Sequence, residues 1–163
     1  QKAYGGISER IMDAAADRGT RLHRAVEFQL KYGFRNVDDD CAGYFDGFLK
    51  FMDEHKGWKP IHSEFRFYHP ALLYAGTADL LFSTPKGTIL VDLKTTAQAH
   101  PKLWGVQLAA YQQGIEAFDS SIKIVSTAVL QMSAGGHYIL HNVKTDFPTF
   151  LACYTIFNFK EER

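Results

Sequence analysis

The chain has 163 residues, with 18 Lys or Arg against 18 Asp or Glu, so its formal net charge is zero. This balance excludes a broadly basic, nucleic-acid-binding surface, and the 14% aromatic content excludes an acidic, aromatic-poor disordered chain. Hydrophobic residues make up 46% of the chain, which is enough for one core. The length predicts a single domain over 1–163, and because the first residue is Gln1 we expect a truncated N-terminus.

The two cysteines, Cys41 and Cys153, are too few for a disulfide framework or a four-cysteine metal site. We therefore expect two reduced, buried thiols. No apolar run approaches the roughly 20 residues that a membrane span needs, and no signal-peptide pattern opens the chain. Together these features predict a soluble cytoplasmic protein that does not associate with a membrane.

Residues 7–32 have the apolar periodicity of an amphipathic helix. The apolar face consists of Ile11, Ala15, Leu22, Val26 and Leu30. His23 and Glu27 lie at the edge of this face, and because they are four residues apart they are neighbours on the helix. This arrangement predicts that His23 is held beside the core.

A second amphipathic helix is predicted over residues 39–56 and is expected to end near Gly57. Its expected core residues are Phe45, Phe48, Leu49 and Met52. The acidic run at 38–40 is typical of a helix N-terminal cap, where carboxylates meet unpaired backbone N–H groups.

The remaining elements alternate between strands and helices. Strands are predicted over 60–68, 72–83 and 88–95, a helix over 101–118, strands over 122–132 and 137–143, and a helix over 146–160. The order ααβββαββα predicts an α/β (α+β) fold with a central mixed β-sheet flanked by helices.

Asp92 and Lys94 lie at the end of an otherwise apolar predicted strand. Because they are two residues apart, their side chains point to the same face of that strand. A buried carboxylate or ammonium is costly unless it is paired or bound to a metal. Taken alone, the pattern favours a lone Asp–Lys ion pair at a partly wet sheet edge.

Asp79 lies 13 positions before Asp92, on the neighbouring strand of the predicted hairpin. Two carboxylates that meet there repel each other unless a divalent cation neutralises them, and their hard oxygens suit Mg²⁺ or Mn²⁺. Beside such a cation, Lys94 would stabilise developing negative charge or help to deprotonate an attacking water. Gly76, just before Asp79, is typical of either a bulge or a close backbone approach.

Four motifs follow one another in the chain: Gly19-Thr20-x-x-His23-x-x-x-Glu27, Gly76-x-x-Asp79, Asp92-x-Lys94 and Gln107-x-x-x-Tyr111. In this order they resemble the motif set of the RecB-like exonuclease branch of the PD-(D/E)XK nuclease superfamily, over about residues 19–111. The resemblance implies a restriction-endonuclease-like core and divalent-metal-dependent DNA cleavage. One departure is Ala78, which precedes Asp79 where the family name has proline.

The resemblance also implies roles for single residues. The metal ligands would be His23, Asp79, Asp92 and the backbone carbonyl of Leu93, and Lys94 would be the catalytic lysine. Gln107 and Tyr111, one helical turn apart, would contact substrate or orient the centre. Glu64 would assist the metal or the water, and its alternative is a surface strand carboxylate. Glu27 would support His23 from outside the ligand set, and its alternative is a solvated helix residue.

Charge is unevenly distributed along the chain. Residues 18–35 hold five basic residues and one acidic residue, a net charge of +4, on the helix that carries His23. Arg21 and Arg24 are therefore expected to contact phosphates, with a solvated helix face as the alternative. Thr95 and Thr96 would bind phosphate through their hydroxyl groups, although Thr is also a common strand residue.

These expectations define a Mg²⁺- or Mn²⁺-dependent deoxyribonuclease that acts on single-stranded DNA or duplex ends in replication, recombination or repair. The resemblance favours a bacterial or phage setting. Two cysteines cannot build the iron–sulfur cluster of some relatives, so none is expected. The alternatives are a non-catalytic DNA-binding or assembly subunit and a metalloenzyme for a small phosphorylated molecule; a partner subunit or homo-oligomer stays open.

Overall fold

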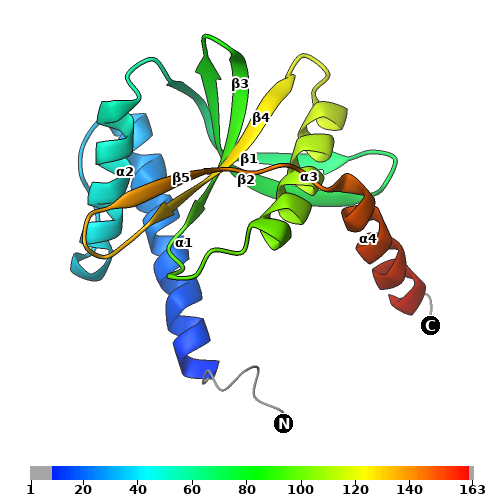
Figure 1. Cartoon of the computed structure of the whole chain (residues 1–163), viewed down its shortest axis with the longest axis horizontal. Coiled ribbons are helices and arrows are strands. Elements are labelled where there is room, and N and C mark those ends of the chain that lie inside the picture. The colour runs from blue at the N-terminus through cyan, green and yellow to red at the C-terminus, as the bar shows by residue number, and fades with distance from the viewer. Residues whose placement is uncertain (1–8, 162–163) are drawn as a thin grey trace. The chain divides into compact units, whose positions relative to one another are not determined.

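The computed structural model describes residues 9–161, and within its helices the side chains of 9–12 and 161 are not described. The elements in chain order are α1 (Glu9–Tyr32), the short 3₁₀ helix η1 (Asp39–Cys41), α2 (Ala42–Glu54), β1 (Lys59–His69), β2 (Tyr74–Thr84), β3 (Gly87–Lys94), α3 (Pro101–Phe118), β4 (Ile124–Met132), β5 (Tyr138–Asn142) and α4 (Phe147–Glu161) (Figure 1). Residues 7–8 of the first predicted helix, and the side chain of Ile11, lie outside this description.

The five strands form one sheet in the order β1-β2-β3-β4-β5. β1 pairs with β2, and β2 with β3, in antiparallel ladders. β3 and β4 are joined through α3, the kind of connection that parallel neighbours need, so the sheet is mixed. The predicted α+β architecture, a mixed sheet with flanking helices, is confirmed.

Backbone contacts divide the chain into two compact units. Unit 1 consists of residues 1–56, 93–99 and 130–140, and unit 2 of residues 57–92, 100–129 and 141–163. The division falls within three strands: after Asp92 in β3, after Val129 in β4 and after Leu140 in β5.

In unit 1, α1 packs beside α2 (Figure 1). Leu22 and Val26 of the predicted apolar face are almost fully buried. On α2, Phe45 and Phe48 are buried as expected, but Phe51 is the third core residue, and Leu49 and Met52 are only partly buried. The three phenylalanines lie three residues apart, so the helix presents a narrower apolar stripe than the sequence pattern indicated.

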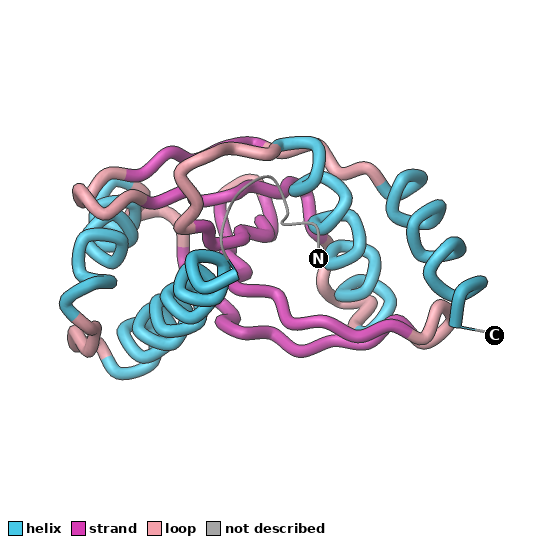
Figure 2. The backbone as a smooth tube through the Cα atoms, turned by 90° about the horizontal axis from the view of Figure 1, so that it is seen from below, coloured by secondary structure: helices cyan, strands magenta, loops and turns pink. Residues whose placement is uncertain are grey.

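In unit 2, α3 packs over β1 and β2, and α4 packs against α3. Figure 2 shows β1 and β2 as two long strands that run side by side. α3 begins at Pro101, because proline has no N–H to lose in the first turn of a helix. The predicted bounds of this helix, 101–118, are confirmed.

The ring of Phe67 on β1 occupies space that two glycines leave open. A Cβ atom on Gly76 would lie 2.7 Å from Phe67 Cζ, and one on Gly114 of α3 would lie 2.2 Å from Phe67 Cε2. The β1–β2 register is regular through Gly76, so the predicted close approach is confirmed and the bulge is wrong. The irregularity in this ladder lies instead between Pro60 and His62.

The cysteines differ from the expectation that both are buried. Cys41 is fully buried, and its burial raises the pKa of its thiol. Cys153 is exposed on α4. Among the helices of residues 9–161, none is long and apolar enough to cross a bilayer.

Candidate metal and nucleic-acid site

Three carboxylates lie on the neighbouring strands β1, β2 and β3. Ser63 pairs with Leu80 and Phe65 with Ala78, so Glu64 stands opposite Asp79. The β2–β3 ladder ends where Leu80 pairs with Val91, and Asp79 and Asp92 are the next residues beyond that last pair. Residues directly opposite each other in an antiparallel ladder point to the same face. Glu64 and Asp79 therefore share a face of unit 2, and continuing the β2–β3 register by one step would add Asp92 to this row.

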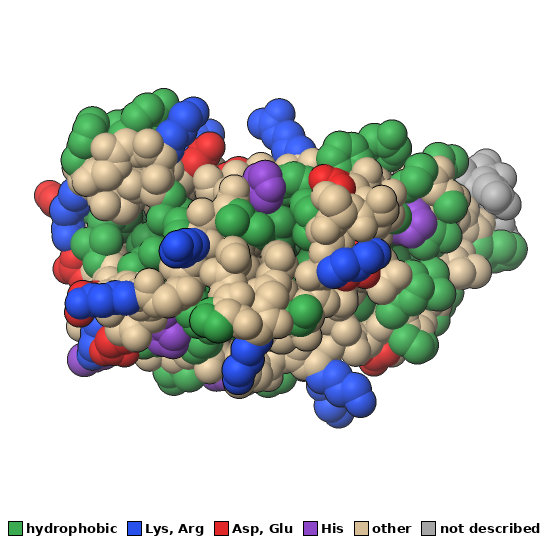
Figure 3. All heavy atoms as spheres, turned by 90° about the horizontal axis from the view of Figure 1, so that it is seen from above, with side chains coloured by type: hydrophobic (Ala, Val, Ile, Leu, Met, Phe, Trp, Pro, Cys, Tyr) green, Lys and Arg blue, Asp and Glu red, His purple; other side chains and the backbone are tan. Residues whose placement is uncertain are grey.

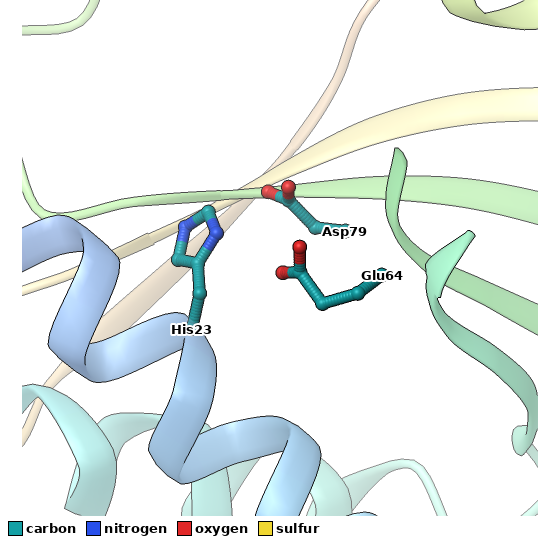
Figure 4. A group of neighbouring side chains, drawn as sticks. All are labelled: His23, Glu64 and Asp79. Atoms are coloured by element: carbon teal, nitrogen blue, oxygen red, sulfur yellow. The ribbon is translucent and has the colours of Figure 1, made fainter. Parts of the chain in front are cut away.

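Glu64 and Asp79 form a close pair in this row. Their carboxylate oxygens lie within 4.8 Å of each other, and the two side chains point toward a common space in Figure 4. Asp79 is only 8% exposed, and Glu64 is partly buried. At this separation two ionised carboxylates repel each other, and a divalent cation held by both would remove the repulsion.

The backbone at Glu64 is unusual for a strand. Its φ of +50° lies in the left-handed region, which non-glycine residues rarely adopt. Such a conformation costs on the order of 1–3 kcal/mol and is typical of positions where a side chain is aimed at a site. This backbone conformation accompanies the closeness of the Glu64 carboxylate to Asp79, in a part of β1 that keeps its register with β2 from His62 onward.

Asp92 is held by α3. Gln107 Nε2 donates a hydrogen bond to Asp92 Oδ1 at 3.2 Å and a second to the Tyr111 hydroxyl oxygen at 2.9 Å. Asp92 is 2% exposed, so this amide contact orients an almost fully buried carboxylate. The structure thus brings Gln107, Tyr111 and Asp92 together, although among the described residues Asp92 is not within the close group formed by Glu64 and Asp79.

Lys94 is the last residue of β3, and Leu93 before it is buried. Lys94 belongs to unit 1 and Asp92 to unit 2, so their shared face remains a prediction from the spacing of two residues on a strand. The strand ends there, so Thr95 belongs to the loop that follows rather than to the predicted strand 88–95, and Thr96 is the next residue of this loop. Thr96 is fixed in this loop, because Gln131 Nε2 donates a hydrogen bond to its carbonyl oxygen at 2.7 Å.

The residues expected on the first helix all lie on α1. His23 and Glu27 are partly buried, and Arg24 is exposed. Figure 4 draws His23 on α1 with the two carboxylates of unit 2. His23 belongs to unit 1, and Glu64 and Asp79 belong to unit 2.

Arg21 is engaged by acidic side chains of unit 1. Its guanidinium group lies 2.9 Å from Asp17, 2.9 Å from Asp38 and 2.6 Å from Asp40. These hydrogen bonds hold the pKa of Asp40 below its usual value and that of Arg21 above it. As predicted, the acidic run lies at a helix N-terminus, with Asp38 as the N-cap residue of η1 and Asp39 and Asp40 in its first turn, but Asp38 makes no side-chain capping hydrogen bond. The run binds Arg21 instead, and a phosphate contact by Arg21 stays a prediction.

Basic side chains do not gather into one patch on the face that Figure 3 draws. Lys and Arg side chains there stand apart from one another or beside acidic side chains. This distribution agrees with the zero net charge and with the pairing of Arg21. On that face, electrostatic contact with a phosphate backbone would therefore be limited to single basic side chains.

Gln131 and Ser133 are not among the residues that the sequence motifs predicted, although Thr95 and Thr96 beside them are. Gln131 lies on β4 and reaches the loop after β3 only because the two strands are neighbours in the sheet. No short motif marks this contact, since the residues it joins are 35 positions apart. Gly43 and Gly47 on α2 are the one sequence feature that indicates close packing in this region, because two glycines at this spacing let another segment approach the helix closely.

Comparisons with known proteins identify the family of this chain. The family model of the PD-(D/E)XK nuclease superfamily matches residues 7–133. No curated protein sequence gives a significant match. The chain belongs to the PD-(D/E)XK nuclease superfamily, whose members are nucleases that hydrolyse phosphodiester bonds with divalent metal ions.

Two solved structures show a weaker likeness. The crystal structure of SSO0001 is 16% identical with a TM-score of 0.40, over 88% of this chain and 73% of that one. The structure of Pyrococcus furiosus SfsA in complex with Ca²⁺ is 16% identical with a TM-score of 0.26, over 67% of this chain and 64% of that one. At these TM-scores neither likeness bears on the activity of this chain.

Proposed function

We propose that this chain is a Mg²⁺- or Mn²⁺-dependent deoxyribonuclease of the RecB-like branch that removes nucleotides from DNA ends in replication, recombination or repair. The row of Glu64, Asp79 and Asp92 across three strands carries the proposal. The hydrogen bond from Gln107 to Asp92 supports it, because it joins the third and fourth motifs of the RecB-like set.

Glu64, Asp79 and Asp92 would hold the metal through carboxylate oxygens, with His23 of α1 as the imidazole ligand and the Leu93 carbonyl as a further oxygen. Carboxylate and carbonyl oxygens are the ligands that Mg²⁺ and Mn²⁺ prefer. When bound, the cation would supply Lewis acidity toward a phosphoryl oxygen and neutralise the negative charge of the row. Glu27, four residues after His23 on α1, would support the histidine from outside the ligand set.

Lys94 would act through its Nζ atom on the attacking water. It would hold that water in line with the phosphorus and stabilise the negative charge that develops on the phosphate oxygens. Gln107 would keep Asp92 in the orientation that binding requires. Arg24, Thr95 and Thr96 would contact neighbouring phosphates, and Arg21 would do so if a phosphate displaces its acidic partners.

A digestion series on end-labelled single- and double-stranded DNA with Mg²⁺ or Mn²⁺ tests this function. The wild type is compared with Lys94→Ala and Asp92→Ala, and with Lys86→Ala as a control at the exposed turn between β2 and β3. We expect both site variants to lose cleavage by 100-fold or more and the control to retain it. Metal-independent DNA binding without cleavage by the wild type would favour a non-catalytic subunit instead.

A further inference from the structure

A cavity of about 310 Å³ lies just beyond the end of β3, within unit 1. Its walls are Tyr44 of α2, residues 95–97 of the loop after β3, and residues 131–134 and 137–139 on either side of the β4–β5 turn. One wall begins at Thr95, the residue directly after Lys94. Consecutive Cα atoms are about 3.8 Å apart, so this wall starts within one residue of the proposed catalytic lysine.

The chemistry of the lining suits a flat, uncharged ligand. None of the described residues that line the cavity is Asp, Glu, Lys or Arg. The lining instead offers side-chain hydroxyl groups, the rings of Tyr44, His137 and Tyr138, and the apolar side chains of Met132 and Ile139. A nucleobase has apolar faces and polar edges that suit this lining, whereas a neighbouring cation, Arg18, lies over the ring of Tyr44 at 5.2 Å and does not itself line the cavity.

The walls are held in place by contacts that need no ligand. A Cβ atom on Gly43 would lie 1.8 Å from the Ala134 carbonyl oxygen, and one on Gly47 would lie 2.9 Å from that of His137. These glycines let α2 press directly against the β4–β5 turn. A preformed cavity loses little conformational entropy when a ligand enters it.

Side-chain hydrogen bonds fix the other two walls. Gln131 Nε2 holds the Thr96 carbonyl oxygen at 2.7 Å, which ties the loop after β3 to β4. The Tyr138 hydroxyl group donates a hydrogen bond to the Glu54 carboxylate, which ties β5 to the end of α2. Both bonds join walls of the cavity to neighbouring elements of unit 1.

We propose that this cavity receives one unpaired nucleobase of the DNA strand whose phosphate lies at Lys94. The inference rests on the proposed nuclease function and names its substrate class: a DNA end with at least one unpaired nucleotide. The base stacks on an aromatic wall, and its polar edge meets the hydroxyl groups. Blunt duplex ends bind only after the terminal pair opens, so single-stranded ends are the preferred substrate.

Filling the cavity from its exposed loop tests this inference. Ala97 lines the cavity and is exposed, whereas Ala99 is exposed on the same loop but does not line it. Ala97→Trp is therefore compared with Ala99→Trp. The probe is a short single-stranded oligonucleotide with 2-aminopurine at its end, titrated in EDTA, because the fluorescence of this base falls when it stacks on a ring.

We expect quenching with the wild type and Ala99→Trp, and at least a 10-fold weaker affinity without quenching for Ala97→Trp. Ser133→Leu narrows the cavity from the opposite wall and should likewise weaken the affinity and the quenching. Agreement between the two variants would show that the loss does not come from misfolding of Ala97→Trp. Circular dichroism checks that each variant is folded. Equal quenching by all four proteins, or quenching by none, overturns the inference.

The failure of this inference differs from the failure of the proposed function. If the wild type cleaves DNA and Ala97→Trp cleaves single-stranded and blunt duplex ends equally well, then the cavity assignment is overturned and the nuclease function is kept. If the wild type cleaves no DNA with Mn²⁺ but quenches the 2-aminopurine fluorescence, and Ala97→Trp abolishes this quenching, then the cavity assignment is kept and the nuclease function is overturned.

Discussion

Gln107 Nε2 lies 3.2 Å from Asp92 Oδ1, and this hydrogen bond connects α3 with the buried end of β3. The same amide nitrogen contacts the Tyr111 hydroxyl group at 2.9 Å, one helical turn further along. Asp92 is 2% exposed, so water does little to set the direction of its carboxylate. The helix therefore determines where Asp92 points, and the motif Gln-x-x-x-Tyr has a definite physical role in this fold.

Gln107→Leu is expected to reduce metal-dependent DNA cleavage and metal affinity by about 10- to 100-fold, the usual effect of losing a partner that orients a metal ligand. Tyr111→Phe removes only the hydroxyl group that positions Gln107, so its effect should be smaller. Cleavage rates measured across a Mn²⁺ titration separate a loss of metal affinity from a loss of turnover.

Gln112→Leu is the matched control on the same helix. Gln112 Nε2 donates to the Ile124 carbonyl oxygen at 3.2 Å, a contact that serves packing rather than the carboxylate row. This variant should keep the Mn²⁺ dependence of the wild type. A Gln107→Leu protein with an unchanged Mn²⁺ profile would show that Asp92 needs no orienting amide.

Glu64→Gln and Asp79→Asn should each raise the metal-free melting temperature slightly. Each change removes one of two like charges that stand opposite each other with their oxygens within 4.8 Å, which relieves about 0.2–1 kcal/mol. With Mn²⁺ the wild type should instead have a higher melting temperature than either variant, because a ligand at 100 times its Kd stabilises the protein that binds it by about 2.7 kcal/mol. Thermal unfolding with EDTA and with Mn²⁺ measures both parts.

Asp53→Asn provides the control for charge removal, because this exposed residue lies in α2 and faces Lys56 at 3.2 Å. It should leave the Mn²⁺ stabilisation intact. His23→Ala should weaken the Mn²⁺ effect without the metal-free gain, since His23 is not one of the opposed acidic pair. A wild type whose melting temperature ignores Mn²⁺ would contradict the proposed ligand set.

Gly114→Ala should destabilise the protein by about 1–3 kcal/mol. Its Cβ would lie 2.2 Å from Phe67 Cε2, and this ring is buried in the core of unit 2. Urea unfolding measures the change. Gly57→Ala is the control, because no atom lies within 4 Å of a Cβ placed there, and this variant should keep the stability of the wild type.

The Arg21 cluster should make stability depend on pH at the acidic end. Hydrogen bonds from Arg21 lower the pKa of Asp40 in the folded protein, so their contribution is complete above the ordinary pKa of about 4. It is lost as the pH falls through the lowered value. The difference in melting temperature between wild type and Asp40→Asn should therefore be constant from pH 5 to 7 and shrink below pH 4.

Asp39→Asn serves as the comparison in this experiment, because it removes a neighbouring charge but none of the Arg21 contacts described above. Added salt should reduce the effect of Asp40→Asn, since the cluster is exposed and screening weakens such pairs. A difference that grows as the pH falls below 4 would contradict the assigned role.

The sequence was sufficient for the element order and for most element bounds. Pro101 predicts the start of α3 because only the first turn of a helix tolerates proline, and alternation between apolar and polar residues predicts the strands. Periodicity was less successful on α2, where Phe51 rather than Met52 is buried. A shift of one residue on a helix depends on which neighbour packs against it, and a single-chain pattern does not contain that information.

The candidate site was predicted in part. The motif order names Asp79, Asp92 and Gln107, and the first two residues lie directly beyond the last pair of the β2–β3 ladder, Leu80 and Val91. The acidic run at 38–40 was assigned to a cap because nothing in a local pattern identifies Arg21, 17 and 19 positions away, as its partner. The cavity lined by residues from α2 and from the loop after β3 was invisible for the same reason.

Phe67 fills the space of two absent side chains, one on β2 and one on α3, and this exchange of volume has an evolutionary consequence. Positions 67, 76 and 114 cannot vary independently, because a larger residue at either glycine requires a smaller one at 67. Members of the family with leucine or valine at position 67 should therefore tolerate alanine at 76 or 114. The three positions should covary as a set even though none of them is an expected metal ligand.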